Sequence, residues 1–230
     1  MQKTVIEHLV NDNDYIERHA KTDYDPTTAM DKDMLFEFLE KTQGDVMDKI
    51  REVYDGGYQA TVVNRIIADI ANRGLVRVLW DGVDFDSGIR LDLVEPRPSA
   101  TFDKKAHDLY DQNILSVMEE VYHKDGERID LVIMLNGIAI FTIELKCETS
   151  ASGWTYRDAI DQYKFERDPH TPLLEPKRGA LAHFAMDLDE VWVCAELKGE
   201  DSNFLPFNQG VPEEGNVHAT SDSATSRLRM

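Results

Sequence analysis

Apolar side chains recur at helical spacing through the first third of the chain. Met34, Leu35, Phe38 and Leu39 follow Asp31, a residue type that commonly caps helices, and they fall on one helical face. Helical spacing and helix-ending residues predict helices over residues 6–10, 31–39, 45–54 and 59–73.

The spacing of apolar residues changes after Gly74, a residue type that commonly ends a helix. Short apolar runs between polar turns then predict strands over residues 75–80, 89–94, 114–123, 129–135, 138–147, 182–186 and 191–196. Helical spacing returns over residues 103–111 and 156–167, and the sequence is polar and loop-like from residue 199 onward. We therefore expect a mixed α/β (α+β) protein.

The composition suits a protein with a sizeable core. Hydrophobic residues make up 42% and charged residues 30% of the 230 positions, which argues against global disorder. No apolar run approaches the roughly 20 residues that a membrane-spanning helix needs, and the N-terminus lacks a secretion signal pattern. The two cysteines, Cys147 and Cys194, suit a reducing compartment. We expect a cytoplasmic protein that makes no use of a membrane.

The formal net charge of −19 limits the classes of function. Proteins that bind DNA without a partner need clustered Lys and Arg to contact the phosphates. This chain has 44 acidic residues and 25 Lys and Arg. If the protein acts on DNA, a metal ion and a partner or further segment must offset the repulsion. The acidity could equally serve solubility alone.

Three charged residues stand where an apolar hairpin would normally carry apolar ones. Asp130 opens the first predicted strand, and Glu144 and Lys146 lie two apart near the end of the second, so these two share a face. Two acidic oxygens and the Leu145 carbonyl suit Mg²⁺, which prefers oxygen ligands. An ammonium nearby can assist a metal-bound water and offset charge on an attacked phosphate. This set favours hydrolysis of a phosphodiester bond.

The parity of the hairpin tests this hypothesis. With a two-residue turn at Asn136-Gly137 and regular pairing, Ile129 would face Glu144, and Asp130 would lie on the other side of the sheet. A three-residue loop, or a single bulge, restores Asp130 opposite Glu144. The site therefore requires an odd residue in this hairpin.

Several ordered segments resemble the nuclease region at the N-terminus of type I restriction enzyme R subunits (HsdR). They are DLVIMLNGI (130–138), IELK (143–146), DAIDQY (158–163), RDP (167–169), GALAHFA (179–185), DEV (189–191) and FLPFNQG (204–210), preceded by YDP (24–26), AMD (29–31) and LFEFL (35–39). The resemblance covers about residues 23–216, most of the chain, and is more specific than the acidic pair with its lysine.

This resemblance implies a PD-(D/E)xK fold, in which helices flank a mixed central β-sheet. It implies Asp130, Glu144 and Lys146 as catalytic residues with Mg²⁺ as cofactor, and a supporting Gln162 on the following helix. The family's fuller motif has a tyrosine four positions after the glutamine, where this chain has a glutamate. The motif, which the resemblance places at Gln162 and Tyr163, is therefore altered, and Tyr163 could instead be a core residue on one helical stripe with Tyr156 and Ile160. The candidate DNA-binding residues are Tyr163, Lys164 and Arg167.

The resemblance also implies an organisation and partners. We expect a helical part over residues 1–74 packed on the core, the nuclease core over residues 75–198, and a tail over residues 199–230 that would lead to a motor domain. Double-stranded DNA would be the substrate, and methyltransferase (M) and specificity (S) subunits would be partners. The chain has no phosphate loop of the GxxxxGK[ST] type, so ATP binding is not expected of it. An acid on the first helix, Glu7, fits a catalytic role poorly.

Two other functions remain open at this point. The domain could be a catalytically silent module that docks the translocase or the methyltransferase subunits, as the acidic charge suggests. It could also be a repair-type nuclease of the same fold, because the catalytic residues alone do not distinguish these tasks.

Overall fold

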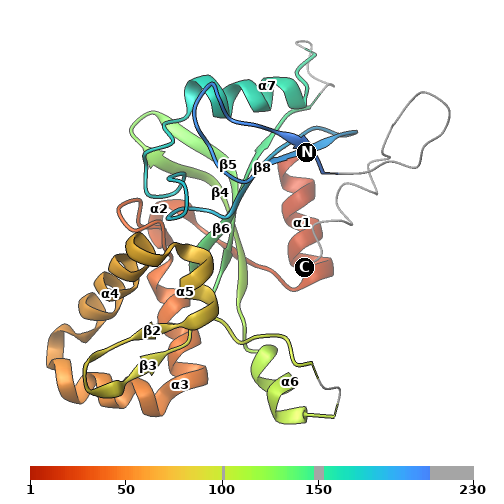
Figure 1. Ribbon diagram of the computed structural model, residues 1–230. Helices are drawn as coiled ribbons and strands as arrows, with labels where there is room; N and C mark the ends of the chain where they lie inside the picture. Colours follow the sequence, from red (N-terminus) through yellow and green to blue (C-terminus); the bar gives the residue numbers. More distant parts are fainter. Residues whose placement is uncertain (100–101, 148–152, 208–230) are drawn as a thin grey trace.

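A seven-stranded mixed sheet runs through the middle of the molecule in the computed structural model, which describes residues 1–99, 102–147 and 153–207 (Figure 1). In spatial order, its strands are β1 (Ile16–Arg18), β4 (Leu115–Lys124), β5 (Glu127–Leu135), β6 (Ile138–Leu145), β7 (Ala182–Met186), β8 (Val191–Cys194) and β9 (Leu205–Pro206). The pairs β1–β4 and β6–β7 are parallel, and the other neighbours are antiparallel. The expected mixed sheet flanked by helices is confirmed.

Helices cover both faces of this sheet because its central strands are apolar on both sides. Helix α1 (Gln2–Asn13) packs Leu9 against the face that carries Val117 and Ile133. The opposite face carries Met118 and packs against α7 (Tyr156–Asp161) and the π-helical turn η3 (Gln162–Glu166). Figure 1 shows α1 and α7 on separate sides of the strands.

A helical lobe forms a separate core beside the turn of the β5–β6 hairpin. It contains α3 (Lys32–Tyr54), η1 (Asp55–Gly57), α4 (Tyr58–Arg73), α5 (Leu75–Asp81), β2 (Val83–Asp84), η2 (Asp86–Gly88) and β3 (Arg90–Leu91). Two other short helices complete the described elements, α2 (Ala20–Asp23) and α6 (Lys104–Tyr110). The lobe lies at the lower left of Figure 1.

The helix signals in the first third of the sequence are confirmed. The carboxylate of Asp31 accepts a hydrogen bond of 3.2 Å from the Met34 amide and caps α3. The two helices expected over residues 31–39 and 45–54 form one element with a kink, because Gln43 has non-helical backbone angles. Helix α4 ends at Gly74, whose φ of 82° is unfavourable for other residues.

Two of the expected strands were wrong or incomplete, and an edge strand was not expected. Residues 75–80 form α5, in which Leu75 and Val78 are buried at helical spacing, because the run packs on the helical lobe rather than in a sheet. Residues 89–94 contribute only the two-residue β3. The edge strand β1 was missed, since three residues with no alternation carry little signal. The limits of the expected parts at residues 74 and 198 stay a prediction.

No helix within the described ranges is both long and apolar enough to cross a membrane.

The turn of the β5–β6 hairpin is anchored to the helical lobe. Asn136 and Gly137 both have positive φ, 51° and 75°, as a tight two-residue turn requires. The Gly137 carbonyl accepts a 2.8 Å hydrogen bond from the Asp31 amide. The buried Asn136 side chain accepts from the Ile114 amide at 2.7 Å and donates to the Leu93 carbonyl at 2.9 Å. These contacts fix one end of the hairpin that carries the candidate site.

We expect Gly137→Ala to lower the free energy of unfolding by about 3 kcal/mol or more. An added Cβ would overlap the Asp31 carbonyl oxygen, and the backbone is left-handed there. Gly126→Ala is the matched control, since Gly126 also has a positive φ, 80°, but open space around its Cβ. Its expected loss is about 1 kcal/mol. Equal losses for both variants in urea unfolding would contradict the anchoring of this turn.

Candidate functional site

The hairpin contains the odd residue that the sequence required. Its turn has two residues, with Leu135 facing Ile138, but the pairing shifts by one between Ile133 and Met134. Ile140 is the extra residue on β6, so the hairpin carries a bulge and not the alternative three-residue loop. The expectation of an odd residue in this hairpin is confirmed.

The bulge brings the two carboxylates to one face of the sheet. Beyond it, Leu131 pairs with Ile143, and continuing this register by one residue places Asp130 opposite Glu144. The Asp130 carboxylate accepts a 2.7 Å hydrogen bond from the Leu145 amide, which ties it to the end of β6. The structure therefore brings together two acids that lie 14 positions apart.

Glu144 is completely buried, and its carboxylate is held on one side only. Oε1 accepts a 2.8 Å hydrogen bond from the Nε of Arg167, whereas Oε2 is buried and has no hydrogen-bond partner among the described residues. Burial raises the pKa of Glu144 to about 8, the nearby Asp130 carboxylate adds to the rise, and Arg167 opposes it. We expect a bound cation to stabilise the charged form of this buried carboxylate.

Lys146 is close enough to Glu144 to act on its charge, and it lines a cleft together with Gln162. Lys146 is two residues after Glu144, and its ammonium lies 5.4 Å from the centre of the Trp154 ring. A cleft of about 390 Å³ is lined by Leu145, Lys146, Cys147, Trp154, Gln162 and Glu166. The Oε1 of Gln162, on η3, is buried, and within the part of the chain that the structure describes it has no hydrogen-bond partner. Single π-helical turns such as η3 are frequent at functional sites.

The described residues contain no group of three or more His, Cys, Asp or Glu side chains that could hold a metal. A cation at Asp130 and Glu144 would need further oxygen ligands from the backbone and from water. That ligand set suits Mg²⁺ and does not suit zinc, which prefers nitrogen and sulfur.

The three expected DNA-binding residues differ in how far they are buried. Tyr163 is completely buried, and its hydroxyl hydrogen-bonds the Thr142 hydroxyl at 2.8 Å, so the structure places it in the core. Arg167 is 9% exposed and engaged with Glu144, which leaves its guanidinium turned away from solvent. Lys164 is half-buried on η3 and Glu7 is exposed on α1.

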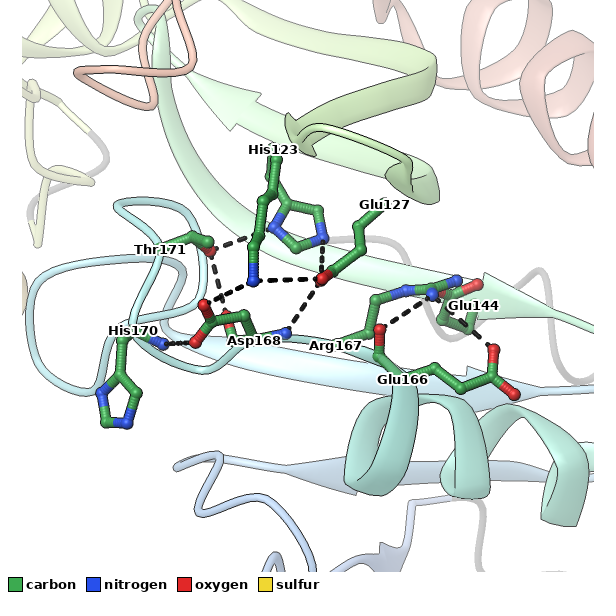
Figure 2. A network of polar contacts seen from close by, with 9 residues as sticks. His123, Glu127, Glu144, Glu166, Arg167, Asp168, His170 and Thr171 are labelled. Carbon is green, nitrogen blue, oxygen red and sulfur yellow. Dashed lines mark hydrogen bonds and ion pairs between the residues drawn. The ribbon is translucent and has the colours of Figure 1, made fainter.

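A cluster of polar residues lies beside the site, and the sequence did not predict it. The Asp168 amide donates a 3.0 Å hydrogen bond to Glu127, and the Asp168 carboxylate pairs with Lys124 at 2.9 Å (Figure 2). His123 is buried, and its Nδ1 lies 3.0 Å from the Thr171 hydroxyl. These contacts join the segment that follows η3 to the β4–β5 hairpin. They form between residues more than 40 positions apart, so local patterns cannot reveal them.

We expect His123 to make the protein less stable in acid. Burial lowers the pKa of His123 to about 4, against 6.5 in a free side chain, so only the unfolded chain takes up this proton between those values. The free energy of unfolding therefore falls as the pH drops from 6.5 towards 4, by about 3 kcal/mol from this residue. Urea unfolding at pH 7 and pH 4.5 measures the loss.

His123→Gln should show a smaller loss of stability over this pH range than the wild type. His170→Gln is the control, because His170 is exposed, and its loss should equal that of the wild type. The same loss in both variants would contradict a buried neutral His123.

Comparison with known proteins agrees with the resemblance seen in the sequence. The family described as the type I restriction enzyme R protein N terminus matches residues 2–202, which include every candidate site residue named above. A search of curated proteins finds no match. The family match covers most of the 230 residues. The chain therefore belongs to the family of type I restriction enzyme R protein N termini, as an N-terminal domain of an R subunit.

Proposed function

We propose that this domain is a Mg²⁺-dependent endonuclease of the PD-(D/E)xK type, which hydrolyses phosphodiester bonds of double-stranded DNA. The observation that supports the proposal is that Asp130 and Glu144 lie on one face, with a buried oxygen of Glu144 that no described residue hydrogen-bonds. A buried, unpartnered carboxylate oxygen is costly unless a ligand completes it.

The residues present fit a magnesium ion. Asp130 and Glu144 would hold it through their carboxylates, and the Leu145 carbonyl would add a ligand. Two carboxylates, one carbonyl and water are an oxygen set that Mg²⁺ commonly accepts. When bound, the ion supplies Lewis acidity to the phosphate and a more acidic water.

The chain's own residues supply the remaining chemistry. The Lys146 ammonium, on the same face as Glu144, would orient the attacking water and offset negative charge on the attacked phosphate. The Trp154 ring holds this ammonium by a cation–π contact at the mouth of the cleft. Gln162 would orient groups in the site through its buried, unpartnered Oε1.

The proposed enzyme cuts with little sequence preference of its own. The residues of the site are suited to phosphate and metal, and they do not form a reading surface for base edges. With a net charge of −19, the domain would receive its DNA from the rest of a restriction complex, including the methyltransferase and specificity subunits. Lys164 is the candidate that remains for a contact to the DNA backbone.

Plasmid nicking with Mg²⁺ tests the proposal. We expect Asp130→Ala to abolish nicking, because it removes a metal ligand. Lys146→Ala should lower the rate by about a hundredfold, because it removes the charge that stabilises the transition state.

Asp125→Ala and Lys105→Ala are matched controls at exposed positions, and both should nick like the wild type. Equal activity of the wild type, Asp130→Ala and Lys146→Ala would exclude this site as the nuclease centre.

A catalytically silent docking module is the second candidate. The ion pair between Arg167 and Glu144 favours it, because it already balances the charge of Glu144 without a metal. The two candidates differ in metal binding: a silent module gives no Mg²⁺ site in calorimetry, whereas the nuclease gives one that Glu144→Ala removes.

A further inference from the structure

Glu144 lies at a position where a lone carboxylate would be unfavourable. It is completely buried near the end of β6, and moving an unpaired charge out of water costs far more than a surface ion pair returns. Its partner, Arg167, is nearly as buried, with 9% of its side chain exposed. A pair at this depth is not one of the solvated ion pairs that contribute little.

The geometry of the pair is one-sided. Arg167 contacts Oε1 through its Nε, and the 2.8 Å distance is typical of a charge-assisted hydrogen bond. A guanidinium can also bind both oxygens of a carboxylate through two parallel bonds, which would leave neither oxygen free. Here Oε2 is buried and has no hydrogen-bond partner among the residues that the structure describes. The carboxylate is thus fixed by one oxygen only.

The direction of the Arg167 side chain is set by contacts on both sides of its backbone. Arg167 follows the π-helical turn η3 in an extended conformation, with φ −112° and ψ 132°. Its Nη1 donates a 3.4 Å hydrogen bond to the Glu166 carbonyl, and Asp168, the next residue, is tied to Glu127 and Lys124 of the β4–β5 hairpin. Figure 2 shows Arg167 between this cluster and Glu144.

We propose that Arg167 is a positioning residue of the metal site: its guanidinium holds Glu144 by one oxygen so that the other oxygen faces an incoming divalent cation. This inference rests on the proposed nuclease function and assigns Arg167 to the support of the metal ligand, in place of the DNA contact expected from the sequence. The polar cluster of Lys124, Glu127 and Asp168 belongs to the same support. Residues that orient metal ligands in this way commonly influence affinity although they never touch the ion.

Calorimetric titration of the 230-residue chain with MgCl₂, and separately with MnCl₂, tests the inference. We expect Arg167→Gln to weaken metal binding by about ten- to a hundredfold, because Glu144 loses the charge and the bond that hold it. Arg167→Lys keeps the charge but lacks the planar fork, and its dissociation constant should lie between those of the wild type and Arg167→Gln.

Arg157→Gln is the matched control, since it removes the same charge from an exposed arginine on α7. It should bind the metal like the wild type. Thermal unfolding of each metal-free protein separates a loss of stability from a loss of affinity. A purely structural role for Arg167 would lower the melting temperature and leave the dissociation constant of the folded protein unchanged.

The outcomes distinguish this inference from the proposed function. If the wild type binds metal, Glu144→Ala does not, and Arg167→Gln binds as tightly as Arg157→Gln, the metal site stands and the role of Arg167 is overturned. Tighter binding by Arg167→Gln would also overturn it, because Arg167 would then be a competitor of the cation. If the wild type and Glu144→Ala both fail to bind, the proposed function fails and the inference fails with it.

Discussion

The register of the β5–β6 hairpin is the constraint on which the candidate site depends. Side chains alternate between the faces of a sheet, so a shift of one residue moves a carboxylate to the other side. Ile140 is the extra residue that places Asp130 opposite Glu144. The bulge cannot move easily, because the Asn136–Gly137 turn is fixed to Asp31, Ile114 and Leu93. The helical lobe thus contributes to the site from a distance, by holding the end of the hairpin.

Burial is the second constraint, and it acts on stability and function in opposite directions. Glu144 lies where water is excluded, which makes its charge unfavourable and raises its pKa to about 8. The same low polarity strengthens every interaction that the carboxylate makes with a cation. Arg167 supplies a positively charged partner for the Oε1 of Glu144, and the Oε2 has no hydrogen-bond partner among the described residues. Stability alone would be better served by an apolar residue at this position.

Under the proposed function, the acidity of the chain suits a domain whose DNA is bound by other subunits. A protein that binds DNA by itself needs Lys and Arg to contact the phosphates. A domain whose DNA is bound by other subunits needs fewer of them. The net charge of −19 is compatible with such a domain. The two basic groups near the carboxylates are each engaged within the chain: Lys146 contacts the Trp154 ring, and Arg167 pairs with Glu144.

Local patterns in the sequence determined much of the fold and the composition of the site. Asp31 and Gly74 marked helix ends, because capping and left-handed turns depend on a few neighbouring atoms. Asp130, Glu144 and Lys146 were found because charges are rare in an apolar hairpin, and parity then demanded a bulge in that hairpin. The run at residues 75–80 was misassigned, because a short apolar segment suits a strand and a helix equally well until its packing partners are known.

Only the tertiary structure decided how the site is supported. The sequence placed Tyr163 on an apolar helical stripe with Tyr156 and Ile160, as expected of a core residue, but nothing in it distinguished the buried Arg167 from a solvated charge. Folding buries Tyr163 against Thr142 and turns Arg167 towards Glu144, 23 positions away. The physical reason is that these contacts depend on where η3 crosses the sheet, and that position results from the packing of the whole chain.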